Sequence, residues 1–188
     1  MKQLSKIILK IFGWKLKGEL PDIKKSVVVM APHTSYWDFV IGRLYLNAMG
    51  ITNNTLIKKE MFFFPLKIIM NFLGAIPVDR KNRKSNMVSQ VAAIIKKREE
   101  CNVFVAAEGT RKKVTRWKKG FYHIAREANV PIVISYIDYK TKEVGIKGTI
   151  NDTTTIEKTM KEINAFYINV IPKHPELFSL DNSYRDLN

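Results

Sequence analysis

A histidine and an aspartate stand five positions apart in the segment Pro32-His33-Thr34-Ser35-Tyr36-Trp37-Asp38. The segment lies between an apolar run and an amphipathic one, so a strand-to-helix turn can bring the imidazole and the carboxylate together. A carboxylate that accepts a hydrogen bond from one ring nitrogen fixes the tautomer and makes the other nitrogen more basic. That nitrogen could take a proton from a substrate hydroxyl. The same pattern also fits an ordinary helix start, with Asp38 as its N-terminal carboxylate and Thr34 and Ser35 as capping residues.

Two further segments combine glycine with arginine. Glu108-Gly109-Thr110-Arg111 leads into a run of basic residues. Gly109 lets backbone amides approach a ligand closely, and Arg111 can hold a phosphate through two hydrogen bonds. The segment running from Gly74 to Arg80 also ends in a cation. Convergence of the two arginines would create an anion site beside the histidine; taken alone, each segment also fits a turn with a solvated basic face.

The elements that must position these segments alternate along the chain. Short apolar runs predict strands, and longer amphipathic runs predict helices. The predicted strands cover residues 26–30, 75–78, 103–106 and 130–134, and the predicted helices begin near residue 38, span 85–97 and begin near residue 120. Strands separated by helices indicate an α/β sandwich with a mostly parallel sheet. Sites in such sheets form at the carboxyl ends of strands, so we expect the site after residues 30, 78 and 106, within a single domain of residues 1–188.

The composition indicates which kinds of molecule the protein could bind and which kinds of site it lacks. Thirty-two Lys and Arg against seventeen Asp and Glu leave a formal charge of +15. Such an excess attracts nucleic acid, anionic lipid headgroups or acidic proteins, and the charge alone does not choose among them. The single cysteine, Cys101, excludes an internal disulfide and a cysteine-rich zinc site.

The first 25 residues form a basic amphipathic segment. Leu4, Ile7, Ile8 and Ile11 fall at helical spacing, and three lysines form a separate row four residues apart. Such a helix could lie on an anionic membrane surface, or it could pack its apolar stripe on the domain. No apolar run reaches the roughly 20 residues that are needed to span a bilayer.

The order of the motifs resembles that of the glycerolipid acyltransferase family, whose best-known members are lysophosphatidic acid acyltransferases. The matching segments are H-x4-D at 33–38, G-x-I-x-V-x-R at 74–80, E-G-T-R at 108–111 and V-P-I at 130–132. The resemblance implies a fold similar to that of glycerol-3-phosphate acyltransferases, with His33 as the general base and Asp38 as the residue that orients it. It also implies a set of residues that bind the phosphate of the acceptor: Gly74, Arg80, Glu108, Gly109, Thr110 and Arg111.

The reaction implied by this resemblance is direct acyl transfer without a cofactor or a metal. His33 would deprotonate a hydroxyl that attacks the thioester of acyl-CoA or of an acyl carrier protein. The expected acceptor is a lysophospholipid such as 1-acylglycerol 3-phosphate, with the hydroxyl of a lyso-aminolipid or glycolipid as the alternative. We expect a peripheral location on the cytoplasmic side of the membrane. Rival classes are a non-catalytic lipid-binding protein and a nucleic-acid-binding module, although no zinc-finger or RNP1 signature is present.

Three apolar features have less specific interpretations. The stretch from Met61 to Leu73 predicts a membrane-dipping element, a wall of an acyl-chain tunnel, or ordinary core. Trp37 is expected to pack rather than to take part in catalysis. Trp117 lies among basic residues and is a candidate interfacial anchor.

Overall fold

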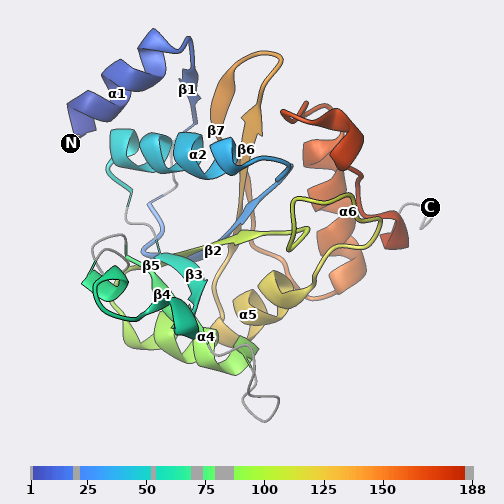
Figure 1. Cartoon of the computed structure of the whole chain (residues 1–188). Helices are drawn as coiled ribbons and strands as arrows, with labels where there is room; N and C mark the ends of the chain where they lie inside the picture. Colours follow the sequence, from blue (N-terminus) through green and yellow to red (C-terminus); the bar gives the residue numbers. More distant parts are fainter. Residues whose placement is uncertain (1, 19–21, 52–53, 69–73, 79–86, 185–188) are drawn as a thin grey trace.

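A computed structural model of the chain describes residues 2–18, 22–51, 54–68, 74–78 and 87–184. Within these ranges seven strands form one sheet in the order β1-β7-β6-β2-β5-β3-β4 (Figure 1). The strands are β1 (Lys15–Lys17), β2 (Lys25–Met30), β3 (Asn54–Lys58), β4 (Ile76–Val78), β5 (Cys101–Ala106), β6 (Ile132–Asp138) and β7 (Glu143–Ile150). Neighbouring strands are parallel except β6 and β7, which run antiparallel.

The central strand β2 shows why this sheet forms. Its three consecutive valines are fully buried, and β-branched side chains suit a strand that is covered on both faces. Successive side chains point to opposite faces. Val27 and Val29 accordingly belong to one core cluster, whereas Val28 belongs to another.

Helices cover both faces of the sheet (Figure 1). The Val27 and Val29 face carries α4 (Met87–Lys97), α5 (Gly120–Ala128) and α6 (Ile156–Tyr167). The Val28 face carries α1 (Lys2–Ile11) and α2 (Tyr36–Met49), which pack against each other. This arrangement confirms the predicted α/β sandwich with a mostly parallel central sheet. None of the helices in the described ranges has the length and apolar character needed to cross a bilayer.

Helix α2 begins and ends at local signals. The hydroxyl of Ser35 accepts a hydrogen bond from the Trp37 backbone N–H, and the Asp38 carboxylate accepts one in return from the Ser35 backbone N–H. This reciprocal cap fixes the first turn of the helix. Gly50 ends the helix with a φ of 74°, a left-handed conformation that glycine adopts without steric cost. Asp38 is therefore held both by its helix and by the preceding turn.

Several elements were not predicted. The strands β1, β3 and β7 and the helix α6 have weak apolar patterns, and β6 extends to Asp138 rather than ending at residue 134. The two tryptophan interpretations were wrong. Trp37 is 56% exposed, because position 37 faces outward on the first turn of α2, whereas Trp117 is 3% exposed. The Trp117 indole N–H donates to the Ser179 carbonyl 3.0 Å away, which fixes it in the core.

Candidate active site

The carboxyl ends of three strands gather the candidate residues at one edge of the sheet. In the register of the sheet, Met30 at the end of β2 lies between Ala106 of β5 and Ser135 of β6. The loops that follow β2 and β5 and the turn that follows β6 therefore leave the sheet side by side. They carry His33, Glu108 and Tyr139, respectively.

His33 and Asp38 form a hydrogen-bonded pair. His33 Nδ1 lies 3.1 Å from Asp38 Oδ2, and the side chain of Asp38 is only 1% exposed. Because an ionised carboxylate can only accept, the geometry favours the tautomer in which Nδ1 carries the proton. Nε2 is then the basic nitrogen. It lies on the side of the ring away from Asp38, and His33 lines a large cavity.

Asp38 is saturated with hydrogen-bond donors. Oδ2 also accepts from the backbone N–H groups of Thr34 and Ser35, at 2.9 and 2.8 Å, and Oδ1 accepts from the Tyr139 hydroxyl at 2.7 Å. Burial alone would raise the pKa of this carboxyl. The donors outweigh burial, and the pKa of Asp38 is held below its ordinary value by His33, Tyr139 and the Ser35 backbone. Asp38 therefore stays ionised beside the imidazole.

Glu108 contacts His33 through the backbone rather than through the ring. Its Oε1 accepts the backbone N–H of His33 at 2.8 Å, and the residue is only 5% exposed. Burial raises its pKa to about 7, against smaller lowering effects from its own backbone and that of His33. Its other oxygen, Oε2, has no hydrogen-bond partner among the described residues. This placement directs the carboxyl toward the histidine loop, and Glu108 itself does not line the cavity that His33 lines. Its predicted contact with the phosphate of an acceptor stays a prediction.

The residues after Glu108 turn toward the cavity. Gly109 has a φ of 69°, and a Cβ at this position would lie 2.9 Å from Cγ of Lys118, so only glycine fits without rearrangement. Thr110 accepts a hydrogen bond from the Lys112 backbone N–H at 3.3 Å. The Arg111 guanidinium lies 3.5 Å from the centre of the Tyr36 ring, a cation–π contact that orients it beside the start of α2.

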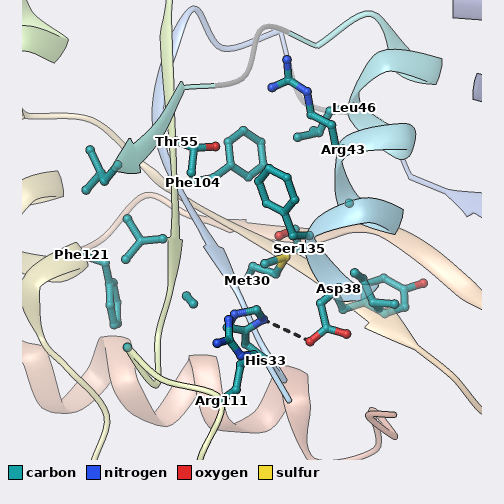
Figure 2. Close-up of a pocket in the computed structure, with 18 of the residues that line it drawn as sticks. Met30, His33, Asp38, Arg43, Leu46, Thr55, Phe104, Arg111, Phe121 and Ser135 are labelled. Atoms are coloured by element: carbon teal, nitrogen blue, oxygen red, sulfur yellow. Dashed lines mark hydrogen bonds and ion pairs between the residues drawn. The ribbon is translucent and has the colours of Figure 1, made fainter. Parts of the chain in front are cut away.

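One cavity of about 1130 Å³ joins these groups (Figure 2). Its polar end holds His33, Asp38, Gly109, Thr110 and Arg111. Its apolar part extends under α2, and Figure 2 shows Met30, Phe104 and Leu46 along this part. The volume is slightly above the roughly 300–1,000 Å³ that is typical of small-molecule pockets. A polar catalytic end joined to an apolar slot suits an amphipathic substrate.

The structure does not bring every predicted residue to this cavity. The carbonyl of Gly74 accepts a hydrogen bond from the Asn54 side chain at 3.2 Å, near the β3–β4 edge, and Gly74 does not line the cavity. Arg80 lies outside the described residues. Of the apolar stretch from residue 61 to 73, the described side chains between 62 and 68 do not line the cavity, and Phe63, Phe64 and Ile68 are exposed.

Two supports of the site were missed. Tyr139 donates to Asp38, and Thr34 Oγ1 accepts the backbone N–H of His174 at 3.2 Å. Tyr139 could have been found if the strand that begins at Ile132 had been extended to Asp138, because Tyr139 then stands at a carboxyl end of the sheet. The contact of His174 joins residues 140 positions apart, and no local pattern predicts it.

The arrangement provides an oriented imidazole, an ionised carboxylate behind it, a nearby guanidinium and an apolar slot. Such a set can deprotonate a hydroxyl on an anionic, lipid-like substrate. Among the described residues, no group of three or more His, Cys, Asp or Glu side chains is placed to hold a metal ion.

The chain matches the family model described as Acyltransferase over residues 15–137, and it belongs to that family. The resemblance drawn from the motifs is thereby confirmed. The chain is 28% identical over 160 residues to the 1-acyl-sn-glycerol-3-phosphate acyltransferase of Saccharomyces cerevisiae, a match that covers 80% of the chain and 51% of that protein. It is also 28% identical over 134 residues to an uncharacterised acyltransferase of Schizosaccharomyces pombe, covering 65% of the chain and 47% of that protein. The chain thus spans about half the length of the curated relatives it matches.

A solved structure has the same fold. The crystal structure of the 1-acyl-sn-glycerophosphate acyltransferase PlsC from Thermotoga maritima superposes with a TM-score of 0.62. The match covers 87% of this chain and 73% of that one, with 18% sequence identity. This likeness shows the fold of the domain.

Proposed function

We propose that the protein is an O-acyltransferase that moves a fatty acyl chain from a thioester to the hydroxyl of a lysophospholipid in phospholipid biosynthesis. The observation that carries the proposal is the His33–Asp38 pair at the polar end of an apolar cavity. Membership of the acyltransferase family and the similarity to the 1-acyl-sn-glycerol-3-phosphate acyltransferase of S. cerevisiae support the reaction class.

In the proposed step, Nε2 of His33 takes the proton of the acceptor hydroxyl as its oxygen attacks the thioester carbonyl. A carbon–oxygen bond forms, the carbon–sulfur bond breaks, and the proton passes from the imidazolium to the departing thiolate. Asp38 stabilises the imidazolium and holds the tautomer. A thioester is already activated, so the step needs no acyl-enzyme, cofactor or metal.

We assign the acyl donor and the acceptor from the negative charges that they carry and the basic residues of the protein. Acyl-CoA and acyl carrier protein both present a thioester together with negative charge, which suits the net charge of +15. We assign the acceptor phosphate to Arg111 and to the segment around Gly109, next to the histidine. A 1-acylglycerol 3-phosphate is the leading acceptor, and a lyso-aminolipid or glycolipid is the alternative.

The proposal includes peripheral binding to an anionic membrane, on the cytoplasmic side. Helix α1 packs on the domain through Ser5 and Leu9, whereas Leu4, Ile7 and Ile11 are 53–74% exposed. Three lysines of the same helix are exposed as well: Lys2, Lys6 and Lys10. An exposed apolar face flanked by lysines is typical of a helix that lies in the interface of an anionic bilayer.

The reaction is tested by thiol release from long-chain acyl-CoA and from acyl carrier protein thioesters, with and without a panel of lysolipids. We expect release that depends on an acceptor and falls about 10²- to 10⁴-fold in His33→Ala. His123→Ala removes an exposed histidine of α5 and serves as the matched control. Release without acceptor dependence would indicate a thioesterase, and no release with either donor would reject the proposal.

The membrane interaction is tested by co-sedimentation with vesicles of phosphatidylcholine alone and with added phosphatidylglycerol. We expect the wild type to bind only the anionic vesicles. Ile7→Glu should release it, because the charge enters the apolar face. Ala165→Glu adds the same charge at an exposed position of α6, on the other face of the sheet, and should bind as the wild type does. Equal binding of the two variants would count against α1 as the contact.

A further inference from the structure

Two aromatic residues that stand just beyond the ends of the family match contact each other next to the catalytic pair. The match covers residues 15–137, and Trp14 and Tyr139 flank it. Their ring centres lie 5.2 Å apart at an angle of 87°, an edge-to-face arrangement. We propose that Tyr139 is a positioning residue of the His33–Asp38 pair and that Trp14 holds Tyr139 in place. This inference rests on the proposed function, because it assigns a third member to the same site.

The first argument is the distribution of donors on Asp38. Oδ2 takes three hydrogen bonds, from the His33 ring and from the Thr34 and Ser35 backbones, whereas Oδ1 takes the hydrogen bond from Tyr139. A carboxylate whose second oxygen has no donor could turn about its Cβ–Cγ bond and weaken the bond to His33. Tyr139 prevents this rotation. Burial, together with the hydrogen bond to Asp38, raises the pKa of Tyr139 above its ordinary value, so its hydroxyl remains a donor at neutral pH.

The second argument is that the position of Tyr139 is strongly fixed. Its backbone N–H donates to the carbonyl of Ile171 at 2.8 Å. The carboxylate of Asp138 accepts the backbone N–H groups of Lys140 and Thr141 at 2.8 and 2.9 Å, which defines the turn after β6. The backbone of Tyr139 is therefore held on both sides, and the Trp14 ring limits its side chain.

Trp14 is itself tied to the turn between β6 and β7. Its backbone N–H donates to Leu9 at the end of α1, and the next backbone N–H, that of Lys15, donates to the carbonyl of Lys142. The ammonium of Lys142 donates in return to the carbonyl of Phe12 at 3.1 Å. A continuous set of contacts thus joins the end of α1 to the carboxylate of Asp38 through two aromatic rings.

The hydrogen bond from Tyr139 lowers the affinity of the His33–Asp38 pair for a proton. The Tyr139 hydrogen bond stabilises the negative charge of Asp38 most when the imidazole is neutral. Its loss raises the affinity of the pair for a proton, and the acid limb of the rate profile moves to higher pH. The other titratable or charged groups near the pair are Glu108, which contacts the backbone of His33, Arg111 beside His33 (Figure 2), and Arg43 and Lys118, which also line the cavity.

The test compares Tyr139→Phe with Tyr122→Phe, which removes a phenolic hydroxyl from α5 that contacts Thr154 and Arg126 instead. We expect Tyr139→Phe to lower kcat about tenfold and to move the acid limb up by about half to one pH unit. The KM for acyl-CoA should not change. The profiles are also measured in the Glu108→Gln background, so that titration of Glu108 does not enter the comparison.

A second readout does not depend on turnover. The His33 ring titration, followed by ¹³C NMR at Cε1, should move upward in Tyr139→Phe and not in Tyr122→Phe. Trp14→Leu keeps the Tyr139 hydroxyl but leaves its ring less constrained. The His33 titration should therefore move in the same direction by a smaller amount. An unchanged His33 titration in Tyr139→Phe and Trp14→Leu would overturn the inference. Absence of turnover in the wild type would reject the proposed function instead, and the NMR result would still decide the role of Tyr139.

Discussion

Two buried carboxylates contact His33, one at its ring and one at its backbone, and their surroundings differ sharply. Asp38 at the start of α2 accepts four hydrogen bonds, and its pKa lies below the ordinary value. Glu108 after β5 accepts the His33 backbone N–H, and the pKa of this carboxyl is raised to about 7. The two residues are almost equally inaccessible, at 1% and 5% exposure. Burial therefore does not decide which of them is charged.

The difference follows from where each residue stands in the fold. A helix N-terminus presents several free backbone N–H groups, and Asp38 is three residues after the N-cap, where it can accept them. The end of a parallel strand offers no such set, because its N–H groups are used within the sheet. The carboxylate that would stabilise an imidazolium in the proposed mechanism is thus placed at the helix start. The carboxyl of Glu108, which contacts the backbone of the loop, can lie where fewer hydrogen-bond donors are available.

The largest expected effect is on Asp38. Asp38→Asn keeps the shape of the side chain but removes the charge that stabilises the imidazolium. We expect acyl transfer to fall about 10²- to 10³-fold, measured as acceptor-dependent thiol release. Asp152→Asn changes an exposed aspartate far from the cavity and should behave as the wild type. A loss below about tenfold in Asp38→Asn would mean that the two carboxylates do not differ in the way proposed.

The two carboxylates also show which parts of the site could be predicted from the sequence. The pairing of His33 with Asp38 was predictable, because a valine-rich strand, a short turn and a capping residue are all local signals. The role of Glu108 toward the backbone of His33 was not, because it depends on how two loops 75 residues apart fit together. Tyr139 was missed for a related reason. Its strand pairs with an antiparallel neighbour whose weak apolar pattern gave no signal of its own.

The next effect concerns stability. The pKa of Glu108 in the folded protein, about 7, exceeds its ordinary value of 4.5. As the pH rises between these values, the unfolded chain loses this proton first, so the folded state becomes relatively less stable. Above pH 7 the penalty is complete, at roughly 3 kcal/mol. Glu108→Gln lacks the titration and should gain stability relative to the wild type on going from pH 4.5 to pH 8.

Urea unfolding of the wild type and Glu108→Gln at the two pH values measures this difference. The amide oxygen of glutamine can still accept the His33 N–H, so the fold of the loop is kept. If the difference in unfolding free energy between the two proteins were the same at both pH values, the pKa of Glu108 in the folded protein would equal its ordinary value, and burial would not have raised it. The contrast between the carboxylates would then be lost.

The smallest expected effect comes from removing the side-chain cap of α2 at Ser35 while leaving Asp38 unchanged. Ser35→Ala removes the side-chain acceptor for the Trp37 backbone N–H, which lies 3.2 Å away. The two backbone donors to Asp38 remain, because they do not involve the hydroxyl. We therefore expect a loss of about 1 kcal/mol in unfolding free energy and a kcat close to that of the wild type.

Thr155→Ala is the control, because it removes the equivalent cap of α6, where the side chain accepts a hydrogen bond from the Lys158 backbone N–H at 3.4 Å. Equal losses of stability with normal turnover in both variants would show that the Ser35 hydroxyl is not needed to keep Asp38 charged, and that its donors from His33, Tyr139 and the backbone suffice. A fall in kcat confined to Ser35→Ala would instead bring the Ser35 hydroxyl into the chemistry, and the advantage of Asp38 over Glu108 would no longer rest on the helix start alone.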